Sequence, residues 1–246
     1  MTYSAFPERD ARMIDDDDYA QEHMKPHKRV HSLDSWRIFR IMSEFVDGFE
    51  TMTFLGPSVA IFGSTNPNPI NPHYYELTTQ LAEKIVKKGF AIITGGGPGI
   101  MECANKGAQM GGGKSCGLCI NLPSEGKQNP YIDPKYKLEF RYFFVRKVMF
   151  VRYAQAFVVM PGGFGTLDEL FEALTLIQTG KIKYFPVYLV GKDYWKGLLD
   201  WLRNTVMENN NIKKIDYDLI RLSDDPDEIA EGIEKHYRQT KSIENF

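Results

Sequence analysis

The sequence has few of the features that mark secreted and membrane proteins. Three cysteines among 246 residues are too few for a disulfide framework. The N-terminal segment carries aspartates where a signal peptide would need an apolar core. The longest apolar runs, such as residues 154–163, are too short to cross a bilayer. These absences predict a cytoplasmic protein without a membrane partner.

An excess of charge of one sign is also missing. The chain has 30 basic and 32 acidic residues, which gives a formal net charge of −2. No sequence-wide field would therefore attract nucleic acid or an acidic membrane, and we expect no nucleic-acid partner. An anionic ligand would have to be bound by a local group of residues.

The chain is predicted to consist of an arm, a helix and one domain. Residues 1–33 are polar, include four consecutive aspartates and lack apolar periodicity, which predicts a flexible arm. Residues 34–54 are predicted to form an amphipathic helix that packs on the main domain or on a partner chain. Its stripe comprises Trp36, Phe39, Met42, Phe45, Val46 and Phe49. Residues 55–240 are predicted to form a single domain, because chains of this length can bury one sizeable core.

Within that domain, short β-type runs alternate with helical patterns. This alternation is typical of an α/β fold in which helices cover both faces of a parallel sheet. The predicted strands span residues 58–62, 90–94, 116–120, 156–160, 185–190 and about 219–222. The predicted helices span residues 73–88, 100–110, 145–154, 166–179, 194–208 and 226–237. Ligands of such sheets bind beyond the carboxyl ends of the strands, near the point where strand order reverses.

Three predicted strands run directly into loops of small residues. These loops are Gly63-Ser64-Thr65, Gly95–Gly99 and Pro161–Thr166. Because glycine has no Cβ, its N–H group can approach a phosphate closely, and a following helix adds a positive end. The loops therefore predict a phosphate site. The alternative is that the glycines serve only tight turns between strand and helix.

Two familiar phosphate motifs do not fit. The dinucleotide fingerprint G-x-G-x-x-G fails because Ile100 or Glu102 falls at its last glycine position, which disfavours a nicotinamide cofactor. Gly113-Lys114-Ser115 resembles the end of a P-loop, but the required first glycine falls on Ala108. We interpret that triplet as a connecting turn.

Thr166 and Glu169 have the spacing of a capping box, in which each side chain binds the backbone N–H of the other residue. This structural role alone would explain both residues. A carboxylate in a first helical turn is also kept charged by the helix dipole. Such a group suits stabilising a cation or activating water better than donating a proton.

Two long segments together resemble a known family. Residues 95–108 read GGGPGIMECANKGA, and residues 139–182 contain an Arg-Lys pair followed by PGGFGTLDE. They resemble the LOG-type nucleosidases, the cytokinin-activating phosphoribohydrolases long mislabelled as lysine decarboxylases. The resemblance covers about residues 55–235. The short first loop and the added N-terminal helix are similar to the longer bacterial branch, so the base need not be a cytokinin.

The resemblance implies a Rossmann-like, doubly wound parallel sheet and a hydrolase. The implied reaction splits a nucleoside 5′-monophosphate, either purine-type or a cytokinin riboside monophosphate, into free base and ribose 5-phosphate. It implies no organic cofactor and no metal. It also implies a homo-oligomer, a dimer or larger, whose active site lies near the dimer interface.

The same resemblance assigns the site residues. The family's catalytic glutamate and arginine fall on Glu169 and Arg146. The residues implied to bind the phosphate and the rest of the nucleotide are Gly63, Ser64, Gly95, Gly96, Gly97, Gly99, Met101, Glu102, Lys147, Met149, Pro161, Gly162, Gly163, Gly165 and Thr166. For Arg146, binding of the phosphate and binding of the sugar hydroxyls both stay open.

Other functions are weaker alternatives. A non-catalytic nucleotide or cofactor carrier of the same fold is the strongest, although Glu169 and Arg146 are both intact. A decarboxylase would need a lysine that forms a Schiff base with pyridoxal phosphate, and no lysine is marked for that role. Cys116 and Cys119 should point to opposite faces of a strand, which argues against a shared metal.

Overall fold

The computed structural model describes residues 26–68, 71–120, 128–240 and 245. The chain divides into two compact units, Met1–Ser43 and Glu44–Phe246, and the boundary falls inside helix α2 (Pro26–Thr53). This helix begins at Pro26, earlier than the predicted start at Asp34, and proline suits a first helical position. Residues 1–25 of the predicted arm lie outside the described residues. The division into arm, helix and domain stays a prediction.

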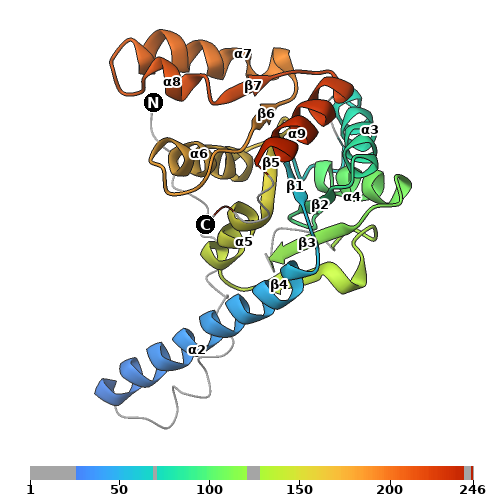
Figure 1. Cartoon of the computed structure of the whole chain (residues 1–246). Helices are drawn as coiled ribbons and strands as arrows, with labels where there is room; N and C mark the ends of the chain where they lie inside the picture. The colour runs from blue at the N-terminus through green and yellow to red at the C-terminus, as the bar shows by residue number, and fades with distance from the viewer. Residues whose placement is uncertain (1–25, 69–70, 121–127, 241–244, 246) are drawn as a thin grey trace. The chain divides into compact units, whose positions relative to one another are not determined.

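Seven parallel strands form one sheet, which confirms the predicted doubly wound α/β class (Figure 1). The strands are β1 (Ser58–Phe62), β2 (Ala91–Thr94), β3 (Ser115–Ile120), β4 (Lys137–Phe140), β5 (Ala154–Val159), β6 (Val187–Leu189) and β7 (Ile220–Leu222). Their order is β4-β3-β2-β1-β5-β6-β7. The chain builds outward from β1 to β4, then returns to the other side of β1 for β5, so strand order reverses between β1 and β5.

Helices cover both faces of this sheet. Helices α3 (His73–Lys87), α4 (Ile100–Met110) and α9 (Pro226–Thr240) lie together on one face, and α5 (Phe143–Tyr153) and α6 (Phe164–Gln178) lie on the other (Figure 1). The first face packs aliphatic side chains of β1, β2 and β5, such as Val59, Ile92 and Val158, against those helices. On the second face the rings of Phe62 and Phe157 lie 4.9 Å apart between their centroids. An apolar layer on each face of the sheet thus packs against the helices that cover it.

The structure adds elements that the sequence patterns do not reveal. Strand β4 was not predicted because its residues are largely exposed at the edge of the sheet, so it lacks a buried apolar run. Helix α7 (Lys192–Trp201) continues as a π-helical segment, Leu202–Met207, and is followed by the short helix α8 (Lys214–Tyr217). A 3₁₀ turn, Pro134–Tyr136, precedes β4. No helix among the described residues is long and apolar enough to span a membrane.

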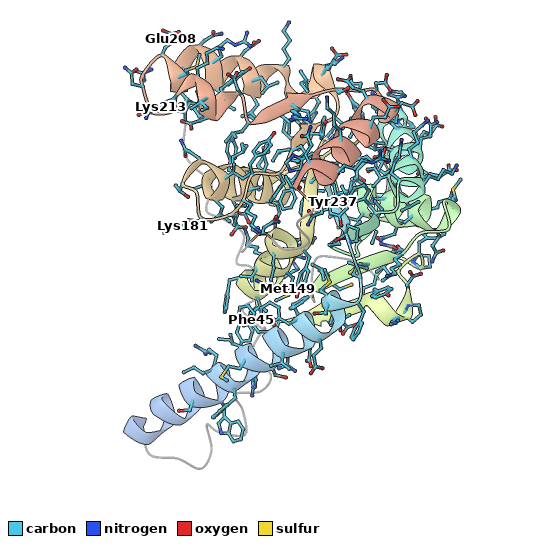
Figure 2. All side chains as sticks on the ribbon, in the orientation of Figure 1. Phe45, Met149, Lys181, Glu208, Lys213 and Tyr237 are labelled. Atoms are coloured by element: carbon cyan, nitrogen blue, oxygen red, sulfur yellow. The ribbon has the colours of Figure 1, made fainter. Side chains whose placement is uncertain are left out.

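The part of α2 that begins at Glu44 contacts the sheet domain. The Glu44 carboxylate accepts hydrogen bonds from the backbone N–H groups of Arg141, at 2.9 Å, and Tyr142, at 3.3 Å. Met149 of α5 lies beside α2 (Figure 2), and a Cβ on Gly48 would come within 2.8 Å of its sulfur. Glycine at position 48 therefore permits the two helices to approach closely.

A buried polar cluster joins α4 to the loop after β2 and to the segment between β3 and β4. The Asn105 side chain accepts hydrogen bonds from Thr94 Oγ1 at 2.6 Å and from Asn129 Nδ2 at 2.9 Å, and it donates to Ser115 Oγ at 2.8 Å. Asn129 also donates to the carbonyl of Gly97 at 3.0 Å. The fully buried Asn105 holds Asn129 in place, and Asn129 in turn binds the glycine-rich loop after β2.

We predict that Asn105→Ala lowers the free energy of unfolding by about 3 kcal/mol, because it leaves several buried polar groups without partners. Urea denaturation at neutral pH would measure this loss. Asn211→Ala, at an exposed position, should change stability by less than about 0.5 kcal/mol. An equal effect of the two substitutions would contradict the role of the cluster.

Candidate functional site

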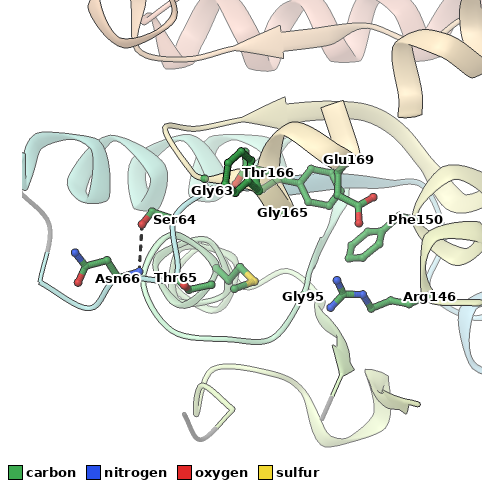
Figure 3. Close-up of a pocket in the computed structure, with 14 residues that line it drawn as sticks. Gly63, Ser64, Thr65, Asn66, Gly95, Arg146, Phe150, Gly165, Thr166 and Glu169 are labelled. Atoms are coloured by element: carbon green, nitrogen blue, oxygen red, sulfur yellow. Dashed lines mark hydrogen bonds between the residues drawn. The ribbon is translucent and has the colours of Figure 1, made fainter. Parts of the chain in front are cut away.

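A hollow at the carboxyl ends of the strands lies where strand order reverses. It has a volume of about 400 Å³ and opens between the loops that follow β1 and β5 (Figure 3). Its walls come from the ends of three strands and from α4, α5 and α6: Phe62, Gly63, Ser64, Thr65, Asn66, Gly95, Met101, Arg146, Phe150, Gly163, Phe164, Gly165, Thr166 and Glu169. This is the position at which ligands of doubly wound sheets bind.

Backbone hydrogen bonds tie the loops of the site together. The Ser64 N–H donates to the carbonyl of Pro161 at 2.9 Å, and the Met160 N–H donates to that of Phe62 at 2.8 Å. The Ile100 N–H donates to the Ser64 carbonyl at 3.0 Å, which links the start of α4 to the same loop. Gly99, at φ +73°, has no room for a Cβ against the carbonyl of Ser64. The floor of the pocket thus depends on these backbone hydrogen bonds and on a glycine at position 99.

The start of α6 offers free backbone donors to the pocket. Gly163 occupies the N-cap position and supplies no side-chain cap. Among the described residues, no acceptor binds the N–H groups of Phe164 and Gly165. A Cβ on Gly163 or Gly165 would meet only open space. Unpaired N–H groups at the positive end of a 15-residue helix make a binding site for an anion such as phosphate.

The capping-box prediction is wrong. Helix α6 begins at Phe164, so Thr166 already lies inside the first turn and Glu169 lies in the second. No side chain caps this helix end, and the first turn contains no acidic residue. The glycines before Thr166 allow the helix to begin earlier than the Thr-x-x-Glu spacing suggests. Glu169 therefore projects from the helix into the pocket and does not turn back to its start (Figure 3).

The environment of Glu169 favours the neutral acid, contrary to the expectation of a carboxylate kept charged by the helix dipole. The residue is only 4% exposed, and its Oε2 atom is buried without a hydrogen-bond partner in the described part of the chain. Burial raises the pKa of Glu169 to about 7, although the positive charges of Lys147 and Arg146 act in the opposite direction. Near neutral pH this carboxyl can therefore accept or donate a proton.

Arg146 reaches the same end of the pocket from α5. Its guanidinium carbon lies 5.1 Å from the ring centroid of Phe143 and 5.8 Å from that of Phe150. The guanidinium and the Glu169 carboxylate both point into the hollow beside Phe150 (Figure 3). A Cβ on Gly95 would come within 2.8 Å of the Met101 sulfur and would lie 3.6 Å from Arg146 Nη1, an ordinary contact distance. A glycine at position 95 therefore leaves room for Met101 beside Arg146.

The structure brings about half of the predicted site residues to the pocket wall. These are Gly63, Ser64, Gly95, Met101, Arg146, Gly163, Gly165, Thr166 and Glu169. The others do not line the hollow: Gly96, Gly97, Gly99, Glu102, Lys147, Met149, Pro161 and Gly162. They belong to the same loops and helices, so the predicted segments are at the site even where the individual residue faces elsewhere.

Several of these outer residues support the wall. The carbonyls of Gly96 and Gly97 accept hydrogen bonds from the backbone and side chain of Asn129, and the Gly96 N–H donates to Thr94 Oγ1 at 3.0 Å. These bonds hold the loop after β2 in place. The carbonyl of Gly162 accepts a hydrogen bond of 2.7 Å from the Tyr194 hydroxyl of α7. Lys147 forms ion pairs with neighbouring acids of α6. These contacts hold the outer residues in place beside the pocket wall.

Five wall residues were not among the predicted site residues: Phe62, Thr65, Asn66, Phe150 and Phe164. Phe164 is 91% exposed. It lies within the predicted glycine loop, so its position in the sequence could have predicted that it lines the pocket. Phe150 borders the pocket, but it is only 1% exposed and also belongs to the core. No local pattern separates a core aromatic that borders a cavity from one that does not.

The described residues contain no cluster of three or more histidine, cysteine or acidic side chains arranged to hold a metal. The two cysteines of the C-x-x-C sequence lie in β3 and have different neighbours. The sulfur of Cys116 is 3.7 Å from that of Met52, whereas Cys119 lies against Gly96. Both thiols are buried packing groups.

Comparison with known proteins identifies the family. A family model described as "Possible lysine decarboxylase" matches residues 101–233, more than half of the chain. The chain belongs to this family, the LOG family. A relative from Oryza sativa subsp. japonica, named a probable cytokinin riboside 5′-monophosphate phosphoribohydrolase, is 31% identical over 156 residues, which are 61% of each chain. A second, from Arabidopsis thaliana and named a cytokinin riboside 5′-monophosphate phosphoribohydrolase, is 32% identical over 56% of this chain and 63% of the relative.

The LOG-family chain thus spans less than two thirds of the length of either relative. Among solved structures, it is similar to the molybdenum cofactor binding protein from the phototrophic bacterium Rippkaea orientalis. The TM-score is 0.55 at 22% identity, over 74% of this chain and 98% of the other. At this identity the likeness concerns the fold, which both proteins share.

We predict that Glu169→Gln stabilises the fold at high pH. A carboxyl whose pKa rises from 4.5 to about 7 on folding favours the folded state fully only below pH 4.5, and this stability is lost as the pH rises through 7. The variant lacks that loss, so its advantage should approach ~3 kcal/mol above pH 7, at ~1.4 kcal/mol per pKa unit, and vanish near pH 4.

Urea denaturation of both proteins between pH 4 and 9 would test this dependence. A variant less stable than the wild type at all pH values would show that Glu169 has a structural role after all. Glu208→Gln, at an exposed position of the same domain, is the matched control and should show no trend with pH.

Proposed function

We propose that this chain hydrolyses the N-glycosidic bond of a nucleoside 5′-monophosphate to give a free base and ribose 5-phosphate. One juxtaposition supports the proposal most strongly. The pocket combines the uncapped start of α6, which suits a phosphate, with a buried carboxyl of pKa about 7 and a guanidinium at its other end. The names of the two plant relatives support a hydrolase of the same kind.

In this proposal the phosphate anchors the substrate. The N–H groups of Phe164 and Gly165 and the Thr166 hydroxyl bind its oxygens, which holds the ribose beside Glu169. Arg146 binds the sugar hydroxyls or the phosphate and adds positive charge at the reacting end. Most of the affinity then comes from the part of the substrate that does not react.

The reaction itself replaces a C–N bond by a C–O bond. As the bond from C1′ to the base nitrogen breaks, its electron pair leaves with the base and positive charge develops on the ribose. Ionised Glu169 stabilises that charge and accepts a proton from the attacking water, whose oxygen bonds to C1′. The proton then passes to the departing base. A pKa near 7 suits a group that accepts a proton and returns it.

The proposed substrate class is a purine-type or cytokinin riboside monophosphate. The plant relatives are named for cytokinin riboside 5′-monophosphates, but their identity to this chain is close to 30%. The wall of the pocket offers apolar surface from Phe62, Met101 and Phe150 for a flat base. A panel of nucleoside monophosphates, with chromatography for the free base, would rank the candidates.

A carrier that binds a nucleotide or cofactor without turnover is the second candidate. It is favoured by the fold shared with the molybdenum cofactor binding protein. It does not account for a buried, protonatable carboxyl beside an arginine in the same pocket. Saturable binding with no free base released from any nucleotide of the panel would support the carrier and contradict the hydrolase.

We also propose a cytoplasmic homo-oligomer with its active site near an interface. Phe143, Phe144 and Phe164 are each at least 45% exposed, and they lie on the two helices that form one side of the pocket. Exposed aromatic side chains of this kind are common at protein interfaces. Light scattering of the purified chain would give the size of the assembly.

We predict that Glu169→Gln lowers turnover at least ~100-fold while substrate binding persists, because only the wild-type side chain can carry the charge that the transition state requires. In the wild type, kcat/KM should fall as the pH decreases through about 7, since protonation removes that charge. Release of free base by a folded Gln variant at the wild-type rate would exclude Glu169 as the catalytic carboxylate.

The second activity prediction concerns the phosphate. A nucleoside without its 5′-phosphate should be hydrolysed at least ~100-fold more slowly in kcat/KM than the corresponding monophosphate, because it loses the contacts that position it. Ribose 5-phosphate should inhibit competitively. Equal rates for nucleoside and nucleotide would remove the start of α6 from the proposed site.

A further inference from the structure

Lys147 follows Arg146 in the chain but does not share its position in the pocket. Its Nζ atom lies 2.7 Å from Asp168 Oδ2 and 3.0 Å from Glu172 Oε2, and its side chain is 15% exposed. It is absent from the wall of the hollow that Arg146 and Glu169 line. Two carboxylates of α6 therefore hold this ammonium group outside that hollow.

Those two carboxylates flank Glu169. Residues 168, 169 and 172 are adjacent or three positions apart on one helix, so their side chains lie on neighbouring parts of its surface. Three acids this close would repel one another and favour protonation of the most buried one. That one is Glu169, which is 4% exposed, whereas the Asp168 and Glu172 side chains are 58% and 30% exposed.

Four charged groups act on Glu169 in the described structure. Arg146 and Lys147 face it from α5, and Asp168 and Glu172 come from its own helix. Arg146 lines the pocket and would be engaged by a bound substrate. Lys147 is paired with the acids of α6 and does not line the pocket.

We propose that Lys147 is a positioning residue: its ammonium group neutralises Asp168 and Glu172 and thereby favours ionisation of Glu169, without contact to the substrate. This inference rests on the proposed function and deepens it. It assigns Lys147 a role different from the nucleotide contact implied by the family resemblance. The carboxyl that reacts would be tuned by an ion-pair network whose members do not line the pocket.

The test compares Lys147→Met with Lys147→Arg. The methionine variant keeps much of the apolar stem and loses the charge, so the acid limb of the kcat/KM profile should move upward by about one pH unit. This corresponds to a roughly tenfold loss of activity at pH 6. The KM measured at pH 9 should stay unchanged. The arginine variant should restore the wild-type profile, because it keeps the positive charge.

A direct titration separates this inference from the proposed function. Carbon-13 NMR of the Glu169 side-chain carboxyl, in protein without substrate, should show a pKa that rises in Lys147→Met. It should fall in Asp168→Asn, which removes a neighbouring negative charge at an exposed position. The second variant keeps the inference testable if the first does not fold. If the wild type releases no base from any nucleotide, the hydrolase proposal fails, but the titration still decides this one.

Lys84→Met is the matched control, because it removes an ion pair of 2.6 Å with Asp227 that lies between α3 and α9. It should leave both the pH profile and the Glu169 titration unchanged. An unmoved titration in Lys147→Met, or a raised KM with an unmoved acid limb, would overturn the proposal. The raised KM would instead mean that Lys147 binds the substrate phosphate.

Discussion

The reversal of strand order between β1 and β5 is the constraint on which the site depends. Because β2 follows on one side of β1 and β6 on the far side of β5, the connections after these two strands must diverge. The sheet leaves a hollow there, and backbone hydrogen bonds from Ser64 to Pro161 and from Ile100 to Ser64 fix its floor. Every residue proposed to react or to bind phosphate reaches the ligand from a loop or helix that starts at this edge.

The hollow combines two features with opposite electrostatic preferences. The start of α6 is left uncapped, which suits a negatively charged ligand. One turn further along the same helix, a carboxyl is buried, which costs free energy whenever it is ionised. Lys147 and Arg146 reduce this cost without cancelling it, so the pKa settles at about 7. A site that binds an anion and also holds a buried acid needs cations nearby, and α5 supplies them.

The glycines serve different purposes on the three loops. Gly163 and Gly165 leave open space at the start of α6, where a phosphate would need to approach the backbone. Gly95 leaves room for the side chain of Met101. Gly99, by contrast, allows the loops after β1 and β2 to touch, and Gly96 packs against Cys119. A glycine-rich loop is thus evidence for a tightly packed edge as much as for a ligand.

The sequence by itself determined the fold class, six of the seven strands, the place of the pocket at the strand ends and the family. These depend on local signals: alternating apolar runs, glycine after a strand and a distinctive motif. The sequence pattern did not predict the edge strand β4, because that strand is short and exposed. The sequence pattern also did not predict the true start of α6, because a Thr-x-x-Glu spacing fits a helix that begins at Phe164 as well as one that begins after Thr166.

Only the tertiary structure decided which residues face the pocket and what charge they carry. Burial of Glu169 comes from packing against the end of the sheet and α5, and the resulting pKa reverses the expectation drawn from its place in a helix. Lys147 and Arg146 are neighbours in the chain, yet one meets the acids of α6 and the other enters the hollow. Desolvation and ion pairing depend on groups brought together from distant segments, so no local pattern encodes them.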